Sequence, residues 1–176
     1  MKEKTLKKIL KEILEFSKLF LFSLIVAMFI KDTVVASAVV PTGSMEETVV
    51  TGSRIIINRL AYTFEEPQRG DIVTFYYPDD GKTQYLKRII GLPGETVEII
   101  DGIVYIDEKP LTEDYLKEEM IGDFGPFTVP QDSYFMMGDN RNNSWDSRYW
   151  NDKYVDISKI IGKAELEYYP EIKFLE

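Results

Sequence analysis

The sequence predicts a mainly β protein, with one β-rich domain preceded by a single N-terminal membrane-spanning helix. An uncharged apolar run, Leu19–Ile30, follows a lysine-rich segment, and short β-branched and aromatic runs bounded by Gly and Pro recur after residue 38. The length of 176 residues allows one domain of ordinary size and an appendage. We therefore expect an anchor over residues 1–35 and a β-rich domain over residues 36–176.

The N-terminal segment has the charge pattern of a membrane anchor. Residues 1–18 carry six lysines against three glutamates. Apolar residues recur at helical spacing, which predicts an amphipathic helix on the membrane surface that leads into the apolar run: Leu6, Ile9, Leu10, Ile13 and Leu14. The run itself is shorter than the roughly 20 residues of a full span. Because basic flanks stay in the cytoplasm, we expect everything after the helix to lie outside.

Two alternatives compete for this segment. The small residues Ala36-Ser37-Ala38 are typical of a signal cleavage site, so the segment is alternatively a cleavable secretory signal. Against this, Lys31-Asp32 interrupts the chain and the site lies far from the apolar run. The second alternative, a core helix of a soluble protein, does not explain the lysine-rich flank. A retained anchor is the favoured interpretation.

Strand patterns dominate the rest of the chain. Val97–Ile106 predicts a hairpin, with Asp101-Gly102 set for a primed turn. Glu113–Met120 is the one segment after the anchor that reads as a helix. Four further runs predict strands: Arg54–Asn58, Asp71–Tyr77, Tyr85–Ile90 and Ala164–Tyr169.

Composition excludes several kinds of enzyme. The chain has no histidine and no cysteine. A Ser-His-Asp triad, a cysteine nucleophile, a disulfide and the usual His/Cys zinc site are therefore ruled out. Among nucleophilic enzymes, Ser-Lys, Thr-amine and carboxylate chemistry remain.

The charge of the domain restricts its partners. The chain carries −9 and residues 1–18 carry +3, so the remainder carries −12. A domain this acidic is not expected to bind nucleic acid, and anionic lipid would repel it without an anchor. Neutral or cationic substrates fit it better.

The segment Gly138–Arg148 is unusually dense in polar side chains. It interleaves two Arg, two Asp, three Asn and two Ser with Trp145, directly after the apolar run Tyr134–Met137. Such density suits a buried polar network that positions a reactive group. An Asx-rich turn between strands is the alternative.

Ser44 and Lys87 are the candidate nucleophile and base. Pro41 stops an extended apolar segment, and Gly43 permits a sharp turn that presents the Ser44 hydroxyl. Lys87 and Arg88 fall on opposite faces of their strand, and periodicity does not say which is buried. Arginine stays protonated, whereas lysine loses its proton readily when it is desolvated.

These residues lie in four segments that resemble the conserved boxes of bacterial type I signal peptidases. The segments occur in the family's order: Pro41–Met45, Gly70–Phe75, Tyr85–Glu95 and Gly138–Arg148. The resemblance implies a serine endopeptidase, anchored in the cytoplasmic membrane, that removes signal peptides from exported preproteins on the outer face. It also implies a coiled, mostly antiparallel β-sheet fold and no metal or cofactor.

The resemblance also assigns roles to single residues. It makes Ser44 the nucleophile, Lys87 the general base, Thr42 an oxyanion donor and Ser144 the residue that orients the lysine. Asp146 and Arg148 match a supporting ion pair, and Arg88 and Asp139 from the same boxes are counted as further supporting residues. Four residues match positions that line the pockets for small substrate residues: Val40, Met45, Ile55 and Leu86.

From this assignment we expect desolvation to lower the pKa of Lys87, because a protonated amine cannot act as a base. Ser144 would be its neutral partner, while Asp146 would pair with Arg148. One departure is Glu47, which stands where the family commonly has Pro and adds a charge near the substrate groove.

Two other functions are weighed against the peptidase. Ser-Lys self-cleaving repressors share the dyad by resemblance but carry a DNA-binding module, for which this N-terminus is too short and apolar. A catalytically silent, membrane-tethered binding module of the same fold is the second rival.

Overall fold

The computed structural model describes the backbone of residues 2–175 and the side chains of residues 7–31 and 33–175. The chain divides into two compact units, Met1–Val35 and Ala36–Glu176.

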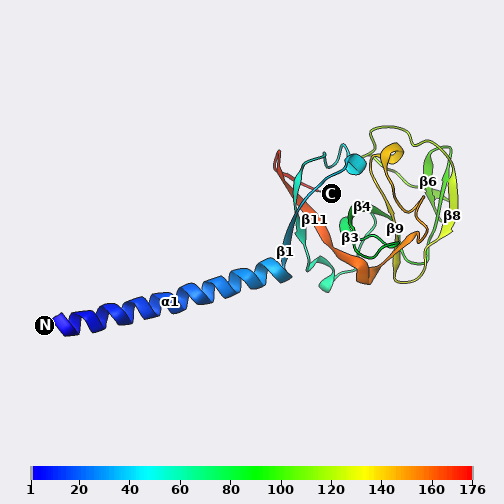
Figure 1. Ribbon diagram of the computed structural model, residues 1–176. Helices are drawn as coiled ribbons and strands as arrows, with labels where there is room; N and C mark the ends of the chain where they lie inside the picture. The colour runs from blue at the N-terminus through cyan, green and yellow to red at the C-terminus, as the bar shows by residue number, and fades with distance from the viewer. Residues whose placement is uncertain (1, 176) are drawn as a thin grey trace. The chain divides into compact units, whose positions relative to one another are not determined.

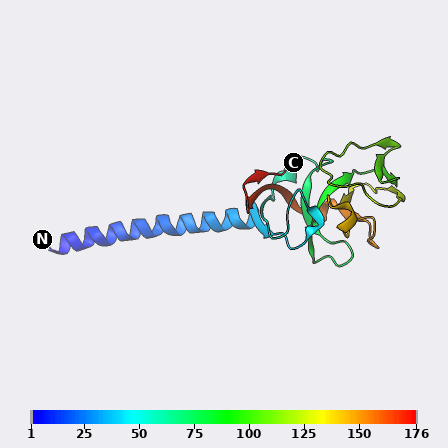
Figure 2. The same cartoon turned by 90° about the horizontal axis from the view of Figure 1, so that it is seen from above.

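The first unit is one continuous helix, α1 (Lys2–Thr33), drawn as an unbroken coil in Figure 2. No Gly or Pro interrupts it, and the hydroxyls of Ser17 and Ser23 donate to carbonyls four residues back. The expected separation into a surface helix and a span is therefore not found. Its stretch Lys7–Lys31 is 25 residues long and apolar enough to cross a membrane. At 1.5 Å per residue this stretch measures about 37 Å, against about 30 Å for a hydrocarbon core.

Twelve strands are found among residues 2–175. They are β1 (Val35–Val39), β2 (Arg54–Asn58), β3 (Ile72–Tyr76), β4 (Gln84–Gly91), β5 (Thr96–Ile100), β6 (Ile103–Ile106), β7 (Lys109–Pro110), β8 (Phe124–Thr128), β9 (Ser133–Met137), β10 (Tyr154–Asp156), β11 (Ile160–Tyr169) and β12 (Lys173–Phe174). Four short 3₁₀ turns connect them: η1 (Gly43–Met45), η2 (Ala61–Thr63), η3 (Arg141–Asn143) and η4 (Ile157–Lys159).

The strands form two sheets, visible in Figure 1. The larger sheet has the order β1-β2-β11-β3-β4-β9-β10, with β12 added to β11, and β4 lies in its interior between β3 and β9. Several of its registers slip by a residue, as at Ala164/Leu166 and Glu167/Tyr169, and such bulges increase strand twist. The smaller sheet has the order β7-β6-β5-β8.

The strands expected from the sequence are found as β2, β3, β4 and β11. The expected hairpin is β5–β6, in which Val97 lies opposite Ile106. Its turn residues Asp101 and Gly102 have φ values of 49° and 77°, as a primed turn requires.

The prediction of a helix over Glu113–Met120 is wrong. The chain there is an irregular strap, residues 111–121, whose side chains bond to distant parts of the domain as well as to one another. Glu113 accepts from Arg141, and Asn142 donates to Glu118. A helix of eight residues gains little by itself, so these long-range contacts outweigh it.

Three groups of buried apolar side chains form the core. One lies between the two sheets, around Val97 and Phe135. A second includes Val40, Met45 and Ile55. The third gathers Phe75 and Trp150 with other aromatic residues. Two neighbouring residues of β4, the strand of the candidate base, pack against different groups: Leu86 against the second and Tyr85 against the third.

Candidate active site

Ser44 lies in the short turn η1, directly after β1. Val40 donates its N–H to the carbonyl of Ser53, which extends the strand pairing, and Pro41 then ends it. Met45 is fully buried in the core, so its side chain anchors the turn to the domain. The Ser44 side chain is consequently held in place with 8% of its surface exposed.

Lys87 reaches Ser44 from β4. Its Nζ lies 2.5 Å from Ser44 Oγ, and the side chain is buried. Pairing with Val73 of β3 fixes the register of Lys87, so two neighbouring strands determine where its amine ends. The two residues that the sequence proposed as nucleophile and base, 43 positions apart, are therefore in hydrogen-bond contact.

The environment of Lys87 disfavours its charged form. Burial lowers the pKa of Lys87 to about 8, although the carboxylates of Asp146 and Asp139 act in the opposite direction. Neither carboxylate forms an ion pair with Lys87, since each is held by an arginine. The direction and the cause of this pKa shift agree with the sequence-based expectation.

Arg88 points to the other side of β4. It forms two hydrogen bonds to Asp139, from Nε at 2.9 Å and from Nη2 at 2.8 Å, and both partners are buried. Thr48 donates to the same carboxylate, and the Arg88 guanidinium lies 4.0 Å from the ring centre of Tyr115. This pair ties the strand of Lys87 to the beginning of the polar segment.

The polar segment is a buried network and not a solvated turn. Arg148 holds Asp146 with its Nε and Nη2, each at 2.8 Å, and both side chains are fully or almost fully buried. Asp146 also accepts from the backbone N–H of Gly138, while Arg148 donates to the carbonyl of Arg141. Because each charge is paired and hydrogen-bonded, the segment is rigid.

Ser144 departs from its expected contact. Its Oγ is buried and has no hydrogen-bond partner among the described residues, so the expected bond to Lys87 is not formed. Lys87 is directed to Ser44 instead. Ser144 still lines the same cavity as Lys87 and packs against Gly138, where an added Cβ would lie within 3.0 Å of Ser144 Oγ.

Thr42 stands at the entrance of the site. Its Oγ1 lies 3.5 Å from Ser44 Oγ, and the side chain is exposed. At that distance it bonds weakly to the nucleophile, but it is positioned beside the atom that would attack.

The reactive pair opens into a groove with a volume of about 740 Å³. Of the four residues expected to contact substrate, Val40, Ile55 and Leu86 line the groove. Met45 does not, and this expectation is corrected: its side chain packs behind Ser44 in the core. Glu47 is also outside the lining; it is exposed and pairs with Lys117.

Sequence reasoning missed two sets of residues around the site. Tyr85, Trp145 and Tyr149 also line the groove. Arg141 is buried and paired with Glu113 of the strap at 2.5 Å. The aromatic lining could have been suspected from Trp145, an aromatic residue inside a polar segment. Nothing local in the sequence indicates the pair formed by Arg141 and Glu113.

The three buried arginines near the site form ion pairs with carboxylates: Arg88 with Asp139, Arg141 with Glu113, and Arg148 with Asp146. No group of three or more acidic residues that could hold a metal ion is found among the described side chains, residues 7–31 and 33–175.

Comparison with known proteins decides the family. Residues 13–169 match the model of the family described as signal peptidase, peptidase S26. The chain belongs to this family. The resemblance drawn from the four boxes is therefore confirmed, and the chain is a serine endopeptidase of the signal peptidase I type.

Relatives agree along most of the chain. A probable signal peptidase I-2 of Synechocystis sp. is 38% identical over 89% of this chain and 73% of its own length. Signal peptidase I P of Bacillus subtilis subsp. natto is 36% identical over 90% of each chain. The crystal structure of a signal peptidase I from Enterococcus faecalis V583 is 39% identical, with a TM-score of 0.50 over 56% of this chain and 97% of its own. The mainly β fold with an N-terminal apolar helix agrees with the prediction.

Proposed function

We propose that this chain is a membrane-anchored endopeptidase that cleaves signal peptides from exported preproteins after small residues, using Ser44 and Lys87 as a dyad. The observation that carries the proposal is the contact between Lys87 Nζ and Ser44 Oγ at 2.5 Å inside a substrate-sized groove. The pKa of about 8 makes the neutral amine accessible near physiological pH.

The first half of the reaction forms an acyl-enzyme. Neutral Lys87 accepts the proton of the Ser44 hydroxyl while Oγ attacks the scissile carbonyl carbon. The resulting ammonium then gives this proton to the leaving amine as the peptide C–N bond breaks. The signal peptide remains esterified to Ser44, and the mature chain leaves.

The second half releases the signal peptide. Lys87, again neutral, takes a proton from water, and the hydroxide attacks the ester carbonyl. The ammonium returns the proton to Ser44 Oγ as the ester breaks. The buried side chain of Lys87 supports this cycle because the charged form gains little solvation.

Thr42 and the backbone N–H of Ser44 are the proposed donors to the oxyanion. The Thr42 hydroxyl is exposed beside the nucleophile, and its weak contact with Ser44 is the one side-chain hydrogen bond found for it among the described residues. One such donor contributes about 3–4 kcal/mol to the stabilisation of a transition state.

The apolar side of the groove is proposed to select small residues. Val40, Ile55 and Leu86 narrow the space beside Ser44, so a small side chain before the cleaved bond fits there. The supporting role of Arg88, Asp139, Asp146 and Arg148 is to fix the elements that carry the reactive pair.

In the proposed topology, residues 1–35 lie on the cytoplasmic side and within the membrane, and residues 36–176 lie on the extracytoplasmic side. The apolar stretch Lys7–Lys31 is long enough for the span, and the lysines before it belong on the cytoplasmic side. N-terminal sequencing of membrane-extracted protein tests this, since a chain that starts at Val39 would show a removed signal instead of an anchor.

Cleavage of a precursor tests the activity. The full-length protein in detergent micelles should convert a signal peptide-bearing precursor to its mature form, and Ser44→Ala should leave the precursor intact. Binding of the precursor without cleavage by the wild type would favour a catalytically silent binding module.

A further inference from the structure

One wall of the groove is made of exposed aromatic rings. Trp145 and Tyr149 have 54% and 41% of their surfaces exposed, and both line the groove. Their rings stack with centroids 5.6 Å apart and planes 12° from parallel. With Tyr85, the third aromatic residue in the lining, they are called the aromatic shelf below. Large apolar surface left open beside a reactive pair is typical of a binding site.

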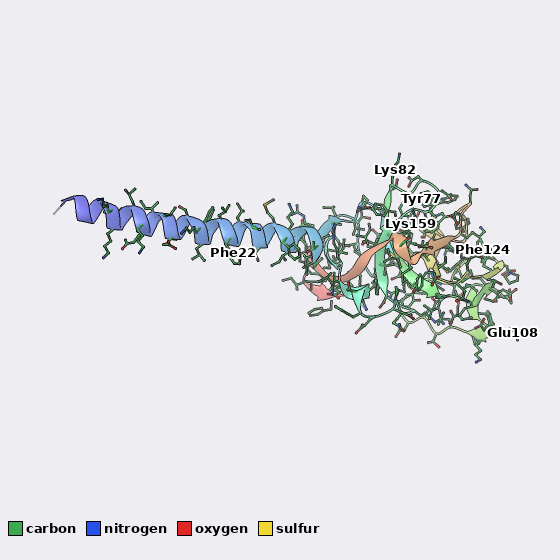
Figure 3. The ribbon with its side chains drawn as sticks, turned by 90° about the horizontal axis from the view of Figure 1, so that it is seen from below. Phe22, Tyr77, Lys82, Glu108, Phe124 and Lys159 are labelled. Carbon is green, nitrogen blue, oxygen red and sulfur yellow. The ribbon has the colours of Figure 1, made fainter. Side chains whose placement is uncertain are left out.

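The shelf is held rigidly by the residues behind it. Trp145 Nε1 donates to the hydroxyl of Tyr77 at 3.4 Å, and Tyr77 stacks on Tyr85 with centroids 4.8 Å apart. Tyr149 packs edge-on against Phe124 at 5.3 Å. Tyr77 and Phe124 can be located in Figure 3. Because these rings are fixed in the absence of substrate, binding to them costs little conformational entropy.

The aromatic shelf and the apolar side of the groove are supported by different core groups. Leu86 packs with the core group of Val40 and Ile55, whereas Tyr85 packs with the group of Phe75 and Trp150. Consecutive residues of β4 thus contribute side chains to opposite walls of the groove, as expected from the alternation of side chains along a strand. Lys87 Nζ is 5.7 Å from the ring centre of Tyr85, so the shelf begins beside the reactive pair.

The occupant of the shelf is expected to be uncharged. Lys87 is the only Lys, Arg, Asp or Glu among the described groove-lining residues, and it is committed to Ser44. A basic substrate side chain would therefore find no carboxylate there, and an acidic one would meet only Lys87, which must be neutral to act as the base. An apolar or aromatic side chain would gain ring contacts and lose little hydration.

The spacing of an extended peptide decides which residues face the shelf. Successive side chains alternate between the two walls. If the residues at −1 and −3 before the cleaved bond face Val40 and Leu86, those at −2 and +1 face the opposite wall. We propose that the aromatic shelf is a substrate subsite that favours a large apolar side chain at −2 or +1, with Trp145 as its main determinant. This inference rests on the proposed function.

Matched peptides test the preference. They share Ala at −1 and −3 and carry Phe or Ser at −2, or Phe or Ser at +1. For the wild type in detergent micelles, we expect the Phe peptide at one or both positions to exceed its Ser counterpart by about 10-fold in kcat/KM, the low end for apolar pockets. Trp145→Ala should reduce this Phe-to-Ser ratio in kcat/KM to below about 3-fold.

Two control variants separate the shelf from general effects. Trp145→Phe keeps a ring and should keep most of the preference. Phe64→Ala removes an aromatic residue that is 91% exposed and outside the groove lining, and it should change nothing. An unchanged Phe-to-Ser ratio in Trp145→Ala at both positions would overturn the inference while leaving the peptidase activity in place.

Binding to the Ser44→Ala protein keeps the inference independent of turnover. Tighter binding of Phe peptides, lost on adding Trp145→Ala, would support the shelf even if the wild type cleaved neither peptide; only the proposed function would then fail. Equal binding of Phe and Ser peptides would overturn the shelf. Two results together would show that the rings contact lipid instead of substrate, and they would also overturn the inference. The first is a shift in Trp145 emission when lipid vesicles alone are added. The second is an equal loss of binding for all the peptides in Trp145→Ala.

Discussion

Replacing Lys87 by Met should abolish precursor cleavage and, at neutral pH, stabilise the folded protein. Met has a similar length and fills the same buried space without a charge. The buried amine is costly in its protonated form, which is why burial lowers its pKa. The reactive group is therefore held against its own solvation preference.

The size of the gain follows from the pKa. The fall from 10.5 to about 8 corresponds to about 3 kcal/mol, at about 1.4 kcal/mol per factor of ten in the protonation equilibrium. The variant also loses the hydrogen bond to Ser44, which contributes about 1 kcal/mol. A net gain of about 2 kcal/mol in the free energy of unfolding is expected.

The gain should depend on pH in a defined window. Below pH 8 both the folded and the unfolded wild type carry a protonated lysine, so the cost is fully present. Between about pH 8 and 10.5 the unfolded chain binds more protons than the folded one, and the wild type becomes more stable as pH rises. The advantage of Lys87→Met should therefore be largest at neutral pH and decline above pH 8.

Urea unfolding of the full-length protein in detergent micelles, followed by tryptophan fluorescence at pH 7 and pH 9.5, measures this. Lys159→Met is the control, since Lys159 is exposed and labelled in Figure 3, and it should shift stability by less than about 0.5 kcal/mol. A Lys87→Met protein that is less stable than the wild type at pH 7 would refute the argument that the ammonium is desolvated.

Three further outcomes are expected. Precursor cleavage should rise with pH around an apparent pKa of about 8, and Lys87→Arg should be inactive because guanidinium stays protonated; an active Lys87→Arg enzyme would contradict the dyad. Gly138→Ala should lower kcat by about 100-fold, since its Cβ would push against Ser144 Oγ; an unchanged kcat would show that the loop yields freely. Asp146→Asn should destabilise the fold by about 3–5 kcal/mol by leaving Arg148 buried without its partner, and thermal unfolding at constant pH checks this.

The fold class could be predicted because local patterns carry it. Alternation and Gly/Pro boundaries located β2, β3, β4 and β11, and Asp101-Gly102 located the hairpin turn. The strap was predicted wrongly because its conformation depends on distant partners. Glu113 is bonded to Arg141, 28 residues away, and no local propensity encodes that contact.

The site shows the same division. Ser44 and Lys87 were identified from residue chemistry and four matched segments, and they are in contact. Met45 was placed in the groove by analogy, but its side chain turns into the core. The bond expected between Ser144 and Lys87 is not found among the described residues, where the amine bonds to Ser44 and Ser144 Oγ has no partner. The sequence shows which residues are neighbours along the chain. It does not show which side-chain rotamer the tertiary packing selects.

By itself, the sequence determined the chemistry that this protein can perform. Without His or Cys, nucleophilic chemistry is restricted to Ser-Lys, Thr-amine or carboxylate sites, and the lysine-rich apolar N-terminus predicted the helix. Only the tertiary structure decided which face of β4 meets Ser44. Lys87 and Arg88 are both buried, because β4 is an interior strand covered on both faces. Period-two alternation puts the two side chains on opposite faces but does not say which face lies toward the site. Packing turned Lys87 toward Ser44, away from carboxylates held by arginines, and that environment gives the amine its lowered pKa.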